Sequence, residues 1–362
     1  MRVQRVAGVA GATAGWTVIG DDRRPVGPVE RYLAWLSDVE RSPNTVRAYA
    51  QDLKTFWVFL GVRGIAWDGV TLEQLGQFTA WLRQPAGNVI VLAGGPAARS
   101  SATVNRMLTA VFGFYEFHAR NGVEVAKALV DRARSGRGGY KPFLHGIARA
   151  SPRGRVGRLR EVRRLPATLT LEQVAAVIHA QSRLRDRFLF ALLFGTGMRV
   201  GQALGLRHGD FVTHERRIEI VPREDNANGA RGKQGVGSVP VSGELVRCYS
   251  DYMHLEYGEL DCDYVFVNLW GGQVGRPMTY ANVNEIVCRT RSRVGFHFTA
   301  HMFRHTYATL ARRGGVPIEI VSKLLTHTST LTTSEIYLHC SAEDLRGELE
   351  RAGVMAKIER AL

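Results

Sequence analysis

The chain has 362 residues, which is enough for two domains with ordinary hydrophobic cores. Apolar residues make up 45% of it, and this share excludes an intrinsically disordered protein. Its 48 basic and 33 acidic residues leave a formal charge of +15, which favours a polyanion or an anionic membrane surface as partner. No apolar run is as long as a membrane span, so nucleic acid is the better partner.

Residues 1–25 are rich in glycine and then in charge, and we expect them to form a flexible N-terminal arm. The uncharged stretch 6–20 follows two arginines, as in a signal peptide, but it contains several glycines and lacks a leucine core. The four cysteines are widely spaced and include no Cys-x-x-Cys pair: Cys248, Cys262, Cys288 and Cys340. This spacing favours neither a zinc site nor a disulfide framework, and it suits a reducing cytoplasm, where we expect the protein to act.

A helical domain is predicted over 26–131. Ser42 can cap and Pro43 can begin a helix, which we expect Gly61 to end. Its apolar positions recur at intervals of three and four: Val46, Tyr49, Leu53, Phe56 and Leu60. Three more helices are expected, one around Tyr32, one after the capping-box spacing at 71–74, and one that ends at 121–122.

The segment 132–165 is strongly basic. It holds eleven basic residues, with Glu161 the only acid, and glycines and prolines interrupt any periodicity. An ordinary solvated segment is one interpretation. We favour a basic linker that contacts phosphates, because a run of one charge sign repels itself and needs counterions.

A second domain is predicted over 166–340. Thr170 and Gln173 have capping-box spacing and begin its first helix. An apolar helix over 188–194 then leads into a Gly-Thr-Gly run.

Two short β runs, 218–221 and 236–241, flank a polar loop and predict a hairpin. Helices dominate after it, so the expected fold is mainly α with a small antiparallel β-sheet. The chain would combine a helical N-terminal domain with a mixed α/β domain. Residues 341–362 are expected to form a helical tail, in which Ser341 and Asp344 have capping-box-like spacing. Its apolar stripe consists of Leu345, Leu349 and Ile358.

Two arginines are candidates for phosphodiester chemistry. An enzyme that moves a phosphodiester must stabilise an oxyanion, activate a nucleophile and protonate a leaving oxygen. Metal enzymes use clustered carboxylates for this, and the sequence shows no such cluster. The guanidinium group is the alternative, because its planar fork bonds two phosphate oxygens and stays charged. The candidates are Arg199 and Arg304, although an isolated arginine more often forms a surface salt bridge.

Sequence motifs give these arginines a context. Arg199 ends a Gly-Thr-Gly-Met-Arg run, and Arg304 lies in a His-x-x-Arg-His box that begins at His301. Tyr337 follows Arg304 by 33 residues and ends a third box, which contains His327. In this order, the boxes resemble those of the tyrosine recombinases, the phage integrase family. The resemblance implies a DNA strand-exchange enzyme that needs no metal, nucleotide or other cofactor.

The resemblance covers about 29–122 and 166–345 and implies a role for each matching residue. Tyr337 would be the nucleophile that attacks the phosphate and forms a 3′-phosphotyrosyl bond. A free phenol has a pKa near about 10, so it needs activation by a base or a cation. His301 would serve that proton transfer, and His327 would donate a hydrogen bond to the phosphate.

Lys233 lies in the hairpin loop and matches the family's β-hairpin lysine, which implies a general acid for the 5′-oxygen leaving group. An ordinary loop lysine is the alternative, since Arg231 stands beside it. His305 more often has a structural part, so we leave it out of the catalytic set.

The chain departs from the family pattern in three places. Gln202 stands where many relatives carry an acid, and Thr326 replaces a usual glycine. His327 and Tyr337 are ten residues apart, where nine is commoner. These changes bear on the geometry of the site and not on the reaction.

The resemblance implies a site-specific recombinase or integrase that clamps double-stranded DNA and assembles as a homo-oligomer, a tetramer in synapsis. A directionality factor is a further partner that the family allows, and no membrane is involved. We expect the tail to dock into a neighbouring protomer, with a helix packed on its own domain as the alternative. A type IB topoisomerase would share the chemistry, and a catalytically silent DNA-binding protein would share the fold. Integration, transposition and resolution stay open as roles.

Overall fold

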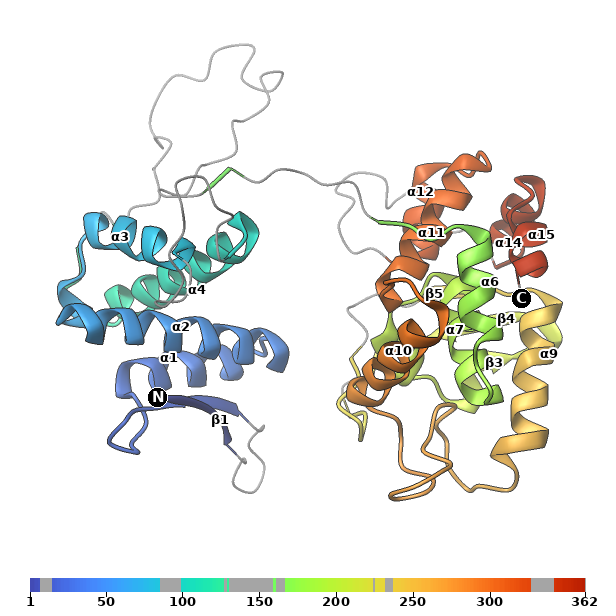
Figure 1. Cartoon of the computed structure of the whole chain (residues 1–362), viewed down its shortest axis with the longest axis horizontal. Helices are drawn as coiled ribbons and strands as arrows, with labels where there is room; N and C mark the ends of the chain where they lie inside the picture. The colour runs from blue at the N-terminus through green and yellow to red at the C-terminus, as the bar shows by residue number, and fades with distance from the viewer. Residues whose placement is uncertain are drawn as a thin grey trace, which may run out of the picture. The chain divides into compact units, whose positions relative to one another are not determined.

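The computed structural model of the chain describes residues 1–6, 15–84, 99–126, 129, 159–160, 167–223, 225–231, 237–326 and 342–361. The chain divides into two compact units, Met1–Arg163 and Arg164–Leu362. Figure 1 shows the first as helices beside a two-stranded hairpin and the second as helices around a small sheet. Each unit has a hydrophobic core of its own.

The first unit begins with a β-hairpin. β1 (Arg2–Val6) pairs antiparallel with β2 (Gly15–Ile19). β2 packs against the first two helices, and Val18 is completely buried there. The expectation of a flexible arm over 1–25 is therefore wrong for these strands. Burial of Val18 and its neighbours offsets the entropy of ordering a chain end that is rich in glycine.

Helices make up the rest of this unit: α1 (Gly27–Asp38), α2 (Pro43–Arg63), the 3₁₀ turn η1 (Trp67–Gly69), α3 (Leu72–Arg83) and α4 (Ser101–Arg120). The predicted caps are present, since the Ser42 hydroxyl accepts a backbone amide at 3.3 Å and Thr71 forms a capping box with Gln74. α2 continues through Gly61, where we expected its end, and stops at Gly64, whose φ is +64°. A glycine inside a helix costs only about 1 kcal/mol, whereas the left-handed conformation ends a helix.

Asn105 on α4 fixes the only stretch of the predicted linker that the structure describes, 159–160. Its side-chain carbonyl accepts the Leu159 amide at 2.8 Å, and its amide donates to the Leu159 carbonyl at 2.9 Å. Leu159 also packs against the core of the first unit. The rest of 132–165 lies outside the described residues, so its contact with phosphates remains a prediction.

α7 (Leu184–Thr196) is the central helix of the second unit, and it is buried all round from Phe188 to Thr196. Its neighbours are α6 (Leu171–His179), α9 (Gly243–Tyr252) and α11 (Ala300–Arg313), as Figure 1 shows. The predicted capping box before α6 is present. A helix without a polar face is stable only when other elements cover it on every side, so α7 organises the core of this unit.

The sheet of the second unit has the order β3 (Phe211–Val212), β4 (Arg217–Ile220) and β5 (Gly237–Pro240), all antiparallel. The predicted hairpin is confirmed as β4 and β5. The remaining elements are α8 (Val200–Leu204), η2 (His208–Asp210), η3 (Thr213–Glu215), the π-helical turn η4 (Met253–Tyr257), α10 (Tyr280–Val294) and α12 (Ile318–Leu324). The fold is therefore mainly α with a small antiparallel sheet, as the sequence predicts.

The C-terminal tail forms α14 (Ala342–Arg351) and α15 (Val354–Ala361). Its buried apolar residues include Leu349, Val354 and Ile358, all in the core of the second unit. α14 packs on β5 and α15 packs on α6. We expected a neighbouring protomer to cover this stripe, and that is wrong for the described tail, because elements of the same chain cover it. Ser341 and the side chains of Asp344 and Leu345 lie outside the described residues.

Candidate active site

A glycine turn between α7 and α8 positions Arg199. Gly197 ends α7 with a φ of +65°, and a Cβ there would lie 2.6 Å from the Tyr307 ring. Glycine is therefore required by conformation and by space. The chain then becomes extended at Arg199, which caps α8. Arg199, the first of the two predicted arginines, thus follows a turn that packs against Tyr307 of the hydrophobic core.

Arg304 lies on α11 and is only 3% exposed. Its Nη1 donates to the Gly197 carbonyl at 2.8 Å, and its Nη2 donates to the Leu325 carbonyl at 2.5 Å. One guanidinium therefore joins the glycine turn before Arg199 to the end of α12. The structure brings the two predicted arginines together through this shared turn.

Neither arginine forms an ion pair with a carboxylate in the described part of the chain. Arg199 Nη1 is buried and has no hydrogen-bond partner among the described residues. Burial lowers the pKa of Arg199. Burial, followed by the positive charge of Arg199, lowers the pKa of Arg304 to about 10. Two desolvated cations with a free donor form a site for an anion.

His301 and His305 lie one helical turn apart on α11, with ring centroids 4.4 Å apart and planes at 78°. His301 is exposed, yet partial desolvation lowers its pKa, and the charges of His305, Arg304 and Arg199 act in the same direction. The pKa of His305 is lowered by burial and by Arg304. A lowered pKa keeps the imidazole of His301 neutral near pH 7, so it can accept a proton.

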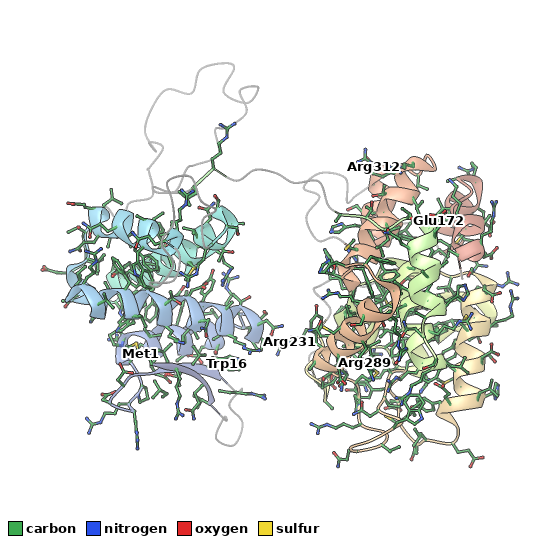
Figure 2. All side chains as sticks on the ribbon, in the orientation of Figure 1. Met1, Trp16, Glu172, Arg231, Arg289 and Arg312 are labelled. Atoms are coloured by element: carbon green, nitrogen blue, oxygen red, sulfur yellow. The ribbon has the colours of Figure 1, made fainter. Side chains whose placement is uncertain are left out.

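Lys233 lies outside the described residues, but both ends of its loop are described. A Cβ on Gly201 of α8 would lie 2.6 Å from the carbonyl oxygen of Arg231, which Figure 2 labels. At the other end, a Cβ on Gly237 would lie 3.3 Å from Thr326 Cγ2. The loop that carries Lys233 therefore begins beside the helix capped by Arg199 and ends beside Thr326.

His327 and Tyr337 also lie outside the described residues, which stop at Thr326 before resuming at 342. Gln202, which we noted as a departure, accepts the Arg199 amide at 2.8 Å and donates to the Thr326 hydroxyl at 2.8 Å. No pattern in the sequence indicates this contact, because 124 residues separate its partners.

The described groups offer an anion the buried Nη1 of Arg199 near the charge of Arg304, and His301 can take up a proton. Within the described ranges, no group of three or more His, Cys, Asp or Glu residues could hold a metal ion. Over the same ranges, no helix is both long and apolar enough to cross a membrane.

The chain is similar to known proteins over most of its length. The phage integrase family matches residues 167–344, and the N-terminal SAM-like domain of phage integrases matches residues 29–122. Transposase A from transposon Tn554 of Staphylococcus aureus is 34% identical, over 97% of this chain and 98% of its own length. Tyrosine recombinase XerD of Mycobacterium leprae is 30% identical, over 88% of this chain and 94% of its own.

Solved structures show the same fold. The integrase of transposon Tn1549, in complex with a circular intermediate DNA, has a TM-score of 0.60 at 16% identity, over 90% of this chain and 99% of that one. A lambda integrase dimer bound to a core site has a TM-score of 0.54 at 15% identity, over 85% of this chain and 96% of that one. With family matches in both units and a relative that is similar along nearly its whole length, the chain belongs to the phage integrase family and is a tyrosine-type DNA recombinase.

Proposed function

We propose that this recombinase cuts and rejoins double-stranded DNA at specific sites through a 3′-phosphotyrosyl intermediate. The observation that carries the proposal is the pair Arg199 and Arg304, two desolvated guanidinium groups with no described carboxylate and a free buried Nη1. Such a pair is costly without an anion, and a phosphodiester supplies two oxygens in the matching geometry.

DNA is the proposed partner because of charge as well as site chemistry. The formal charge of +15 favours a polyanion. The Tn1549 integrase and the lambda integrase, both similar in fold, are described in complexes with DNA. We infer that this chain binds duplex DNA in the same way, as a homo-oligomer that becomes a tetramer in synapsis, within the cytoplasm. A directionality factor remains a further proposed partner.

The proposed reaction uses six side chains. The Tyr337 phenol attacks the phosphorus, a new P–O bond forms to tyrosine, and the bond to the 5′-oxygen breaks. Arg199 and Arg304 hold the non-bridging oxygens, with His327 as a further donor. His301 accepts the phenol proton, and Lys233 protonates the departing 5′-oxygen. A 5′-hydroxyl of a partner strand then attacks the phosphotyrosine and reverses these steps, so the bond energy is conserved without a cofactor.

Recombination is favoured over the relaxation of a type IB topoisomerase. The relatives similar along most of this chain are named as a transposase and as Xer recombinases. Among the roles that the sequence leaves open, the 34% identity to Transposase A favours movement of a mobile element. The DNA ends of such an element are the proposed substrate.

A suicide substrate with a nick near the scissile phosphate tests the proposal. The wild-type protein should form a denaturant-resistant adduct with it, because the released fragment cannot return to reverse the reaction. Tyr337→Phe should bind the same DNA and form no adduct, since only the hydroxyl is lost. An adduct in the phenylalanine variant, on a denaturing gel, would show that another residue is the nucleophile.

A further inference from the structure

Gln202 and Thr326 contact each other although 124 residues separate them in the sequence. The Gln202 amide donates to the Thr326 hydroxyl at 2.8 Å, while its carbonyl accepts the Arg199 amide at 2.8 Å. Both residues are buried, with 5% and 7% of their surfaces exposed. One side-chain amide thus joins the arginine turn to the residue that precedes His327.

Thr326 has a backbone conformation that its side chain disfavours. Its φ is +50°, in the left-handed region, which glycine adopts without steric cost but in which a β-branched residue is a rare outlier. Neighbours hold it there: its amide donates to the Lys323 carbonyl at 2.9 Å, and Arg304 holds the preceding carbonyl of Leu325. These contacts therefore hold Thr326 in a backbone conformation that a threonine disfavours. Its hydroxyl accepts a hydrogen bond that a glycine at this position could not accept.

We propose that Gln202 and Thr326 are positioning residues for the catalytic segment that starts at His327. The Cα atom of His327 is tied to that of Thr326 at about 3.8 Å by the peptide bond, so fixing Thr326 fixes the point at which that segment begins. The carbonyl of the same Gln202 side chain accepts the Arg199 amide. These two hydrogen bonds of Gln202, which we call the latch, therefore couple the phosphate-binding arginine to the start of the segment with His327 and Tyr337. The inference rests on the proposed phosphotyrosyl function.

Three variants separate the parts of the latch. Thr326→Val removes the hydroxyl but keeps the branched shape, and it leaves the Gln202 amide buried without its partner. Gln202→Met removes both bonds. Gln202→Glu keeps both, because a carboxylate accepts from the Arg199 amide and from the Thr326 hydroxyl.

The measurement is the single-turnover rate of adduct formation on suicide DNA at saturating protein, with DNA affinity measured separately. We expect Thr326→Val and Gln202→Met to slow the step by about tenfold each, and the double variant to be no slower than the worse single variant. Gln202→Glu should stay close to the wild-type rate, and DNA affinity should not change in any of them.

The same unit offers a matched control. The Gln181 amide donates to the Thr290 hydroxyl at 3.1 Å, and both residues are buried, Thr290 on α10 and Gln181 just after α6. Thr290→Val should lower the melting temperature and leave the rate of adduct formation by folded protein unchanged. If Thr290→Val slows the step as much as Thr326→Val does, the bond at Gln202 has only a structural role.

Other outcomes also decide the question. Wild-type rates in Thr326→Val, or additive losses in the double variant, would overturn the latch. Should Thr326→Val fail to fold, Thr326→Ser keeps the hydroxyl without the methyl group and should react at nearly the wild-type rate. A tenfold slower Thr326→Ser would contradict the inference. A wild-type protein that forms no adduct would instead refute the proposed function, so the two failures are distinguishable.

Discussion

Arg199 combines a buried, unpaired Nη1 with a like charge nearby on Arg304. We expect Arg199→Met to reduce cleavage of DNA by about 10³ or more, the scale on which a transition-state arginine acts. The same change should leave the melting temperature unchanged or raise it, because it removes a desolvated charge without breaking a described side-chain bond. Single-turnover cleavage and thermal melting, measured on one preparation, check both parts.

Two variants sharpen this test of Arg199. Arg199→Lys should recover little cleavage, because an ammonium group lacks the planar fork. Arg289, which is exposed on α10, provides the control, and Arg289→Met should cleave as the wild type does. Full activity in Arg199→Met would remove the proposed phosphate clamp.

Asp52 in the first unit predicts a dependence of stability on pH. It is 1% exposed, and burial raises its pKa to about 6, although Arg106 beside it acts in the opposite direction. A carboxyl whose folded pKa lies above its unfolded value binds protons better when folded, so it favours folding at low pH. This contribution, up to about 3 kcal/mol, should be lost as pH rises from about 4 through about 6.

The variant Asp52→Asn removes this titration. We expect it to be more stable than the wild type at pH 7–8, and to match it near pH 4, because the wild-type carboxyl is then protonated as well. Denaturant unfolding of the full chain, followed at a signal of the first unit across this pH range, measures the difference. A wild-type protein whose first unit gains stability from pH 4 to pH 7 relative to the variant would contradict the burial argument.

At the scale of elements, α15 is part of the core and not an appendage. Ile358 is 1% exposed, and its side chain lies 3.8 Å from the position that a Cβ on Gly195 would take in the central helix α7. We expect Ile358→Ala to destabilise the second unit by about 2–5 kcal/mol, as large-to-small core changes do. Thermal unfolding measures this, with exposed Arg360→Ala on the same helix as control.

Truncation after Cys340 should therefore impair the fold of the second unit, since it removes Leu349, Val354 and Ile358 from the core. We expect lost cleavage together with lost cooperative unfolding, and not a selective loss of synapsis. A truncated protein that melts like the full chain would restore the idea that the tail acts on a neighbouring protomer.

At the scale of the whole molecule, local signals in the sequence predict most elements. Helix starts are marked by the capping boxes at Thr71 and Thr170, and the end of α7 is marked by a left-handed glycine. Each of these signals involves residues only a few positions apart, so it can be recognised without tertiary information. The N-terminal hairpin was missed because its partner surface lies on α1 and α2, which the strands themselves do not reveal. The covering of the tail was missed for the same reason.

For the candidate site, the sequence suggests residues but not how they are arranged. The motifs indicate Arg199, His301 and Arg304, and these lie together in the second unit. The contact between Gln202 and Thr326 depends on how α8 and α12 pack, and each residue alone looked like a mere departure from the family. Local sequence patterns indicate which side chains are candidates for the site, whereas the packing of the core determines which residues distant in the sequence come into contact.

The two bonds from Arg304 to the carbonyls of Gly197 and Leu325 have a thermodynamic consequence for DNA binding. A free arginine side chain loses about 2 kcal/mol of rotamer entropy when a ligand immobilises it. Here the polypeptide immobilises the side chain as it folds, so this loss is not repeated when a phosphate arrives. The guanidinium is therefore preorganised for the phosphate that we propose it binds. The free energy of folding, and not that of DNA binding, has already covered the loss of side-chain entropy.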